Sequence, residues 1–175
     1  FTDVQSADWF YEAVQFVYEE GLMNGIETDV FGPDVTTTRG MIVSILYRLD
    51  GEPATDLSRF ADVRADAYYA AAVGWAYANG IVTGLDEITF APEAAITREQ
   101  LAAILYRYAV YKGRDTSAGA DVDLSMYTDY EAVSEYAVPA IRWVVGSGLC
   151  NGKGNGILDP QGSATRAEVA AMLQR

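Results

Sequence analysis

A threonine followed by an arginine occurs three times in this chain, each time just before an apolar helical pattern. The three pairs are Thr38-Arg39, Thr97-Arg98 and Thr165-Arg166. Threonine is a good helix N-cap, and a glutamine or glutamate three residues later completes a capping box. Gln100 and Glu168 stand at that position in the second and third copies, whereas the first copy has Met41. The pairs therefore predict three helix starts, two of them with a full capping box.

The arginine at the first helical position calls for a reason other than helix stability. The helix dipole is positive there, so arginine costs roughly a few tenths of a kcal/mol compared with an acidic residue. Free amides at a helix start, together with a guanidinium group, form a binding site for an anion. The alternative is that each arginine pairs with one of the 25 acidic residues of the chain. Recurrence in register leaves both interpretations open.

The three pairs belong to an internal repeat, and this repeat must position them. The first two copies match at an offset of 59 residues, and the third follows at an offset of 67 and then 68. Apolar residues at positions i, i+3, i+4 and i+7 predict a helix, a turn-rich loop and a second helix in each copy. We place the first repeat at 1–59, the second repeat with its connector at 60–126 and the third at 127–175.

One helix-loop-helix unit of this size cannot bury its apolar face alone. We therefore expect an all-α fold in which three helix-loop-helix repeats pack into one compact pseudo-threefold bundle. The apolar second helices should supply its centre, and the Thr-Arg helix starts should lie near three inter-repeat grooves. An open solenoid, or a sheet of more than a few bridging residues, would contradict this expectation.

Composition excludes several functions. The net charge of −13 argues against nucleic acid and against an anionic membrane surface as partners. The chain has no histidine, which removes the commonest metal ligand and general base, and we expect no metal, no cofactor and no catalytic residue. No apolar run approaches the roughly 20 residues of a membrane span, so we expect no membrane insertion. The single Cys150 excludes an intrachain disulfide and is expected to be a small buried hydrophobe.

Two further sets of recurring residues are candidates for ligand contact. Asp3, Asp62 and Asp129 occupy equivalent positions and either contact a ligand or cap a first helix. Trp75 and Trp143 either stack on a sugar ring or pack in the core, and their helical spacing favours the core.

Several motifs resemble the S-layer homology (SLH) domain in its three-repeat form. They are Phe1-Thr-Asp-Val4, Phe60-Ala-Asp-Val63, Gly80-Ile-Val-Thr-Gly84, Phe90-Ala-Pro92 and Thr165-Arg-Ala-Glu168. The resemblance implies a non-enzymatic module that is covalently part of a larger bacterial surface protein. It implies that this module anchors the protein at the extracellular face of the cell wall. It implies as ligand a secondary cell-wall polysaccharide, often pyruvylated, or modified peptidoglycan.

In the family, the arginine of the Thr-Arg-Ala-Glu motif contacts the acidic sugar substituent. The resemblance carries that polysaccharide-binding role to Arg39, Arg98 and Arg166, with three threonines beside them. These threonines are Thr38, Thr97 and Thr165.

Departures from the family motif predict unequal grooves. The first repeat has Gly40-Met41 in place of Ala-Glu, so we expect Arg39 to matter least for binding. The second repeat has Glu99, which is expected to put a negative charge beside Arg98. The overall acidity requires the arginines to create local positive pockets. A protein–protein assembly module of a surface layer is the alternative function, and a glycan hydrolase is disfavoured because no acidic pair stands out.

Overall fold

The computed structural model describes residues 1–57, 59–150 and 152–175. In these ranges the chain forms six α-helices, short 3-10 helices and isolated β-bridges, and no strand. The α-helices are α1 (Tyr11–Glu19), α2 (Arg39–Leu49), α3 (Ala70–Ala78), α4 (Arg98–Tyr111), α5 (Val138–Gly146) and α6 (Arg166–Gln174). The 3-10 helices are η1 (Ser117–Gly119), η2 (Leu124–Met126), η3 (Tyr130–Ala132) and η4 (Glu135–Ala137). The predicted all-α class is confirmed.

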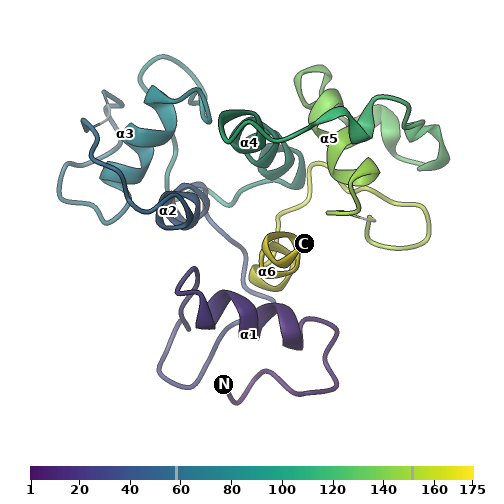
Figure 1. Ribbon diagram of the computed structural model, residues 1–175, viewed down its shortest axis with the longest axis horizontal. Coiled ribbons are helices and arrows are strands. Elements are labelled where there is room, and N and C mark those ends of the chain that lie inside the picture. The colour runs from purple at the N-terminus through teal and green to yellow at the C-terminus, as the bar shows by residue number, and fades with distance from the viewer. Residues whose placement is uncertain (58, 151) are drawn as a thin grey trace.

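The six α-helices form a closed ring around a central axis. Helices α2, α4 and α6, the second helices of the three repeats, surround the centre, and α1, α3 and α5 lie outside them (Figure 1). Helix α3 packs against α2, α5 against α4, and α1 against α6. Each first helix therefore packs on the second helix of the preceding repeat, and the first repeat follows the third. This arrangement confirms the pseudo-threefold bundle and excludes an open solenoid.

A cycle of three backbone hydrogen bonds surrounds the axis. The amide of Thr37 donates to the carbonyl of Ala164 at 2.9 Å, Ala164 donates to Ile96 at 3.1 Å, and Ile96 donates to Thr37 at 2.8 Å. These three residues occupy equivalent positions in the repeats and are fully buried. Isolated bridges flank the cycle at Thr36–Thr165, Thr38–Ala95 and Thr97–Ser163. The backbone just before each central helix is thus fixed by the neighbouring repeats.

The Thr37 hydroxyl is the one polar side-chain group in this cycle, and replacing it should stabilise the fold. Its Oγ1 is buried without a hydrogen-bond partner among the described residues, and its counterparts are the apolar Ile96 and Ala164. Thr37→Val keeps the shape and removes an unsatisfied polar atom, so the free energy of unfolding should rise by about 1–2 kcal/mol. Urea unfolding measures this difference, and Thr36→Val is the control on the exposed neighbouring residue. A loss of stability in Thr37→Val would show that the hydroxyl is satisfied.

The turn after α3 contains a glycine whose replacement should be costly. Gly84 has φ of +76°, and a Cβ there would lie 2.5 Å from the ring of Phe60 and 2.9 Å from the carbonyl oxygen of Asp86. Gly84→Val should therefore destabilise the protein by about 1–3 kcal/mol. Gly113→Val is a matched control, because Gly113 has φ of +69° but open space around its Cα. Equal melting temperatures for Gly84→Val and the wild type would refute the close approach.

Candidate functional site

The three predicted helix starts form, and threonine caps each of them. The Thr38 hydroxyl accepts a hydrogen bond from the Met41 amide at 3.2 Å. Thr97 with Gln100, and Thr165 with Glu168, form complete capping boxes. The threonines thus brace the central helices, and each holds the following arginine at a fixed place on its helix.

The helix-start amides are not free to bind an anion. The first two amides of each central helix donate to loop carbonyls of the next repeat around the ring, at 2.8–3.0 Å. The donor–acceptor pairs are Arg39 to Ala94, Gly40 to Pro92, Arg98 to Gly162, Glu99 to Pro160, Arg166 to Val35 and Ala167 to Pro33. The expected combination of free amides with a guanidinium group is therefore wrong in its amide part. Contacts with a ligand at these helix starts must therefore come from side chains.

Each arginine side chain crosses a repeat boundary in the same way. Its Nε donates to a main-chain carbonyl of the next repeat at 2.9 Å, and the acceptors are Phe90 for Arg39, Leu158 for Arg98 and Phe31 for Arg166. The guanidinium groups of Arg39 and Arg166 also stack over the rings of those phenylalanines, at 4.7 and 4.6 Å from the ring centres. The side chains are therefore held at the interfaces between repeats.

The recurring aspartates hold the loops that supply these acceptors. Asp3 accepts from the amides of Phe31 and Gly32, Asp62 does the same in the second repeat, and Asp129 in the third, all at 2.7–2.9 Å. Burial alone would raise the pKa of Asp3 and Asp129, but these amide bonds outweigh it and lower the pKa of both. The first helices have no side-chain cap. In each repeat the aspartate thus holds the loop between the two helices and does not cap the first helix.

Groove A is the inter-repeat cavity that contains Arg39. It has a volume of about 390 Å³ and is built from all three repeats. Its lining residues are Arg39 from the first repeat, Val82, Thr83, Gly84, Leu85, Gln100, Ala103, Ile104 and Arg107 from the second, and Tyr136 from the third. Its lining combines apolar side chains with the guanidinium groups of Arg39 and Arg107, the amide of Gln100 and the phenol of Tyr136. This composition suits a sugar that carries an acidic group.

Two cations in groove A have no anionic partner. Among the described residues, neither terminal nitrogen of Arg39 has a hydrogen-bond or ion-pair partner in the protein, and the same holds for the whole Arg107 guanidinium. Burial lowers the pKa of Arg39, and the nearby Arg107 acts in the same direction. Tyr136 and, less strongly, Asp62 oppose this effect, and the Asp62 oxygens are bound to loop amides. An anion between the two arginines would relieve their repulsion.

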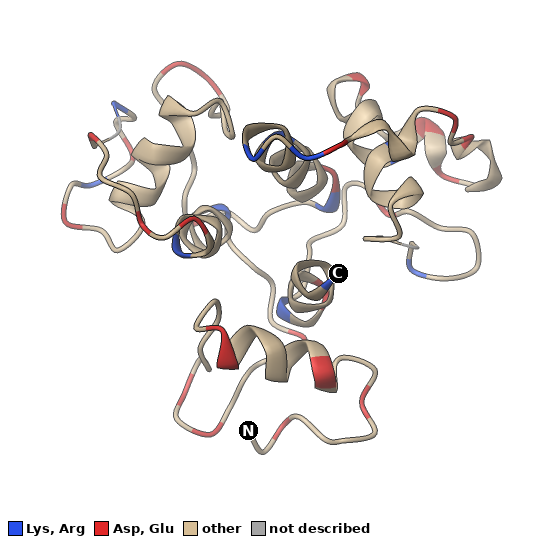
Figure 2. Ribbon diagram, viewed as in Figure 1, with Lys and Arg blue, Asp and Glu red and all other residues tan. Residues whose placement is uncertain are grey.

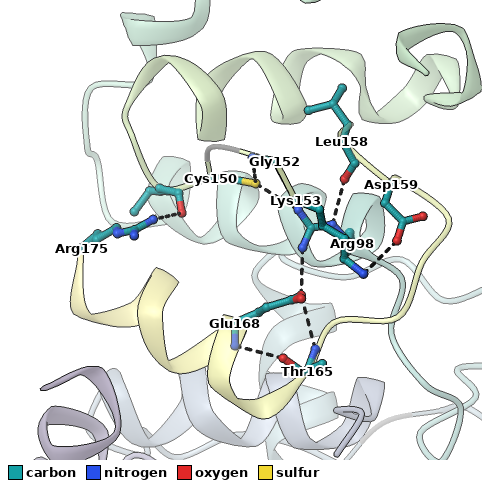
Figure 3. Close-up of polar contacts among 10 residues, drawn as sticks. Arg98, Cys150, Gly152, Lys153, Leu158, Asp159, Thr165, Glu168 and Arg175 are labelled. Atoms are coloured by element: carbon teal, nitrogen blue, oxygen red, sulfur yellow. Dashed lines mark hydrogen bonds and ion pairs between the residues drawn. The ribbon is translucent and has the colours of Figure 1, made fainter. Parts of the chain in front are cut away.

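Groove B, the equivalent cavity around Arg98, already contains a carboxylate (Figure 3). Its volume is about 430 Å³, and Cys150, Lys153, Trp9 and Arg175 are among its lining residues. Arg98 uses all three guanidinium nitrogens: Nε on the Leu158 carbonyl, one terminal nitrogen on Glu168 at 2.8 Å and the other on the sulfur of Cys150 at 3.4 Å. Cys150 is half-buried in this wall, not simply a core residue as expected.

At the third equivalent position, around Arg166, the arginines bind the protein's own carbonyl groups. A terminal nitrogen of Arg166 donates to the Asn24 carbonyl, and Arg48 donates to the Leu22 carbonyl at 3.1 Å. Burial and the nearby Glu93 raise the pKa of Tyr68, and Thr38 and Arg48 oppose that effect. The three predicted arginines thus have one, three and two bonded nitrogens, in the order Arg39, Arg98 and Arg166.

Two recurring sets of groove residues were missed in the sequence. In each repeat a second arginine stands nine residues after the first, within the central helix or directly after it, and an exposed aromatic residue precedes the first helix. The arginines are Arg48, Arg107 and Arg175, and the aromatic residues are Trp9, Tyr68 and Tyr136. Recurrence at the repeat offsets was the available signal for both. Trp75 and Trp143, by contrast, are buried in the core and present no face to a groove.

The acidic charge of the chain lies mostly away from the axis. Figure 2 shows basic segments on all three central helices, while most acidic segments lie in α1 and the outer loops. Basic residues are therefore present at the centre of the ring although the net charge is −13. Within the described ranges, no group of three or more histidine, cysteine, aspartate or glutamate side chains is placed to hold a metal ion. None of the helices described there has the length and apolarity needed to cross a bilayer.

The sequence matches a known family model in three places. The model is the S-layer homology domain, and it matches residues 1–40, 59–102 and 127–170. Each matched range includes one Thr-Arg helix start and the loop before it. The matches together cover more than half of the chain.

Three curated relatives align with nearly the whole chain. An amylopullulanase of Thermoanaerobacterium thermosulfurigenes is 28% identical over 99% of this chain, and an endoglucanase of Bacillus sp. (strain KSM-635) is 29% identical over 99%. A surface-layer 125 kDa protein of Lysinibacillus sphaericus is 31% identical over 94%. The chain spans only 9%, 18% and 14% of these proteins, respectively. The similarity is therefore to one module shared by proteins with different names.

Proposed function

The chain belongs to the S-layer homology domain family, which makes it a non-catalytic anchoring module of the bacterial cell surface, and we propose that it binds an acidic cell-wall polysaccharide. The binding place in this proposal is groove A, and the recognised group is a sugar carboxylate such as a pyruvate ketal. The module would thereby hold a larger surface protein on the wall without a covalent bond.

The observation that carries this proposal is the pair of unpartnered cations in groove A. The two terminal nitrogens of Arg39 form a fork that matches the two oxygens of a carboxylate. Arg107 adds a second positive charge in the same cavity, and the exposed Tyr136 offers a ring face and a hydroxyl. Arg98 and Arg166 remain proposed ligand residues, but fewer of their donors are free. The contacts thus favour Arg39 as the strongest site, the reverse of the order expected from Gly40-Met41.

Groove A also supports treating the repeats as one functional domain. It takes an arginine from 1–59, most of its lining from 60–126 and an aromatic residue from 127–175. We propose that these three segments bind ligand only together. No single repeat contains Arg39, Arg107 and Tyr136 together.

The same contacts are compatible with a protein partner, because an acidic peptide also carries carboxylates. A relative from Lysinibacillus sphaericus named as a surface-layer protein gives this alternative its support. The size of groove A, about 390 Å³, and its aromatic wall favour one or two sugar rings over an extended peptide.

The test is a pulldown with purified cell-wall sacculi before and after removal of the non-peptidoglycan polymer. Binding to intact sacculi that disappears after the polymer is removed supports the proposal. Binding that persists would mean that the ligand is peptidoglycan and not the polysaccharide. Calorimetry with a pyruvylated wall-sugar fragment and with the same sugar lacking the ketal identifies the recognised group. Equal affinity for the two sugars would refute recognition of the carboxylate. Binding only to purified surface-layer protein would favour the assembly module.

A further inference from the structure

Among the residues that differ between grooves A and B, one both completes the helix cap and lines the cavity. That residue is the third in its central helix: Gln100 in groove A and Glu168 in groove B. Both complete the same capping box, since each side chain accepts a hydrogen bond from the backbone amide of its capping threonine. The two grooves are therefore closely matched in backbone geometry, while one has a neutral amide where the other has a carboxylate.

In groove B, Glu168 occupies the position where a ligand carboxylate would bind. Its Oε2 accepts from a terminal nitrogen of Arg98 at 2.8 Å, and the two side chains are only 20% and 11% exposed. An acidic sugar entering groove B would have to displace this shielded internal carboxylate or lie beside it. Both outcomes cost binding free energy, because a charge would lose its partner or face a like charge.

In groove A, the same helix position leaves the arginine fork open. Gln100 uses its Oε1 on the Thr97 amide at 3.1 Å, which leaves its amino group as a donor at the groove wall. An amide cannot form an ion pair with Arg39, and no described carboxylate takes its place. Arg39, Arg107 and Gln100 therefore present donors only, which an acidic group can accept.

We propose that the third residue of the central helix selects which groove accepts an acidic ligand: glutamine opens groove A, and glutamate closes groove B by serving as an internal ligand. This inference rests on the proposed function and adds which groove is used and why. Because the Asn24 and Leu22 carbonyls already bind Arg166 and Arg48 at the third equivalent position, the wild-type protein then binds one acidic sugar per chain.

Exchanging the two residues tests whether the third residue of the central helix, called the selector below, decides which groove binds the sugar. Gln100→Glu should lower the affinity for the pyruvylated sugar by about thirtyfold, because the new carboxylate pairs with Arg39. Glu168→Gln should raise the stoichiometry from one sugar per chain to two. The capping box survives both changes, since each residue caps the same type of helix in this chain. Gln15→Glu makes the same chemical change on the exposed face of α1 and should leave affinity unchanged.

Alkylation of Cys150 is an independent measure of whether groove B is occupied, because Cys150 is the single cysteine of the chain and lines this groove. The sugar should slow alkylation of its thiol in Glu168→Gln and not in the wild type. One site and unchanged alkylation in Glu168→Gln, or wild-type affinity in Gln100→Glu, would overturn the selector while leaving the proposed function in place. A wild type that binds no pyruvylated sugar would refute the proposed function itself, and the selector with it.

Discussion

Arg39→Ala is expected to weaken binding of the pyruvylated sugar by about thirtyfold, the largest loss among the three recurring arginines. The variant loses a charged, two-pronged hydrogen bond to the ligand carboxylate, worth about 2 kcal/mol. Arg39→Lys should recover only part of the affinity, because lysine keeps the charge and lacks the planar fork. Calorimetry at two salt concentrations measures the loss and its electrostatic share.

Two variants separate this loss of affinity from a loss of stability. Arg166 has the same carbonyl bond and the same stacking on a phenylalanine as Arg39, but one of its terminal nitrogens is bound to Asn24. Arg166→Ala should therefore lower the melting temperature about as much as Arg39→Ala and reduce affinity far less. Arg107→Ala should reduce the affinity and leave the melting temperature nearly unchanged, since Arg107 has no described partner in the protein. Equal affinities in Arg39→Ala and the wild type would exclude groove A as the binding site.

Glu99→Ala is expected to destabilise the protein by about 2–4 kcal/mol, although the residue lies at the start of a helix. Glu99 is 3% exposed, and its carboxylate joins the second repeat to the third. It accepts from the amide and hydroxyl of Ser134, at 2.9 and 2.6 Å, and from the side chain of Gln161 at 2.8 Å. Alanine leaves both donors of the half-buried Ser134 without this acceptor and removes the partner of the exposed Gln161 side chain. Urea unfolding, followed by far-UV circular dichroism, measures the difference.

The repeats themselves supply the control for Glu99→Ala. The equivalent residues are Gly40 and Ala167, so a small side chain is compatible with this helix position. Gln161→Ala removes one of the three donors and should cost less than Glu99→Ala. A free energy of unfolding within about 0.5 kcal/mol of the wild type in Glu99→Ala would mean that the three bonds add nothing net.

The local features of the fold could be predicted because their causes lie within a few residues. The Thr97–Gln100 capping box depends on positions three apart, and the apolar helical pattern depends on positions three and four apart. The repeat register then required closure around an axis. Each of these inferences used only spacing along the chain, and the structure confirms them.

The partners of the site residues could not be predicted in the same way, because they depend on the direction of ring closure. Arg39 bonds a carbonyl 51 residues away, and Arg166 one 135 residues away. Nothing near Asp3 in the sequence indicates that its carboxylate holds Phe31. One error was avoidable: Glu99 was expected to face Arg98, although adjacent helix residues do not face each other. Glu99 binds Ser134 instead.

The packing of α1 on α6 has a consequence for how the protein unfolds. In an open array of repeats, each unit contacts only its neighbours, and the outermost units fray first. A ring in which the first helix rests on the last has no outermost unit, so opening any interface exposes the apolar faces of two repeats at once. Loss of structure should then be all-or-none. The amides of Thr37, Ile96 and Ala164, buried at the axis, should exchange their hydrogens with solvent only when the whole domain unfolds. All three should therefore show the same free energy of opening, equal to that of global unfolding.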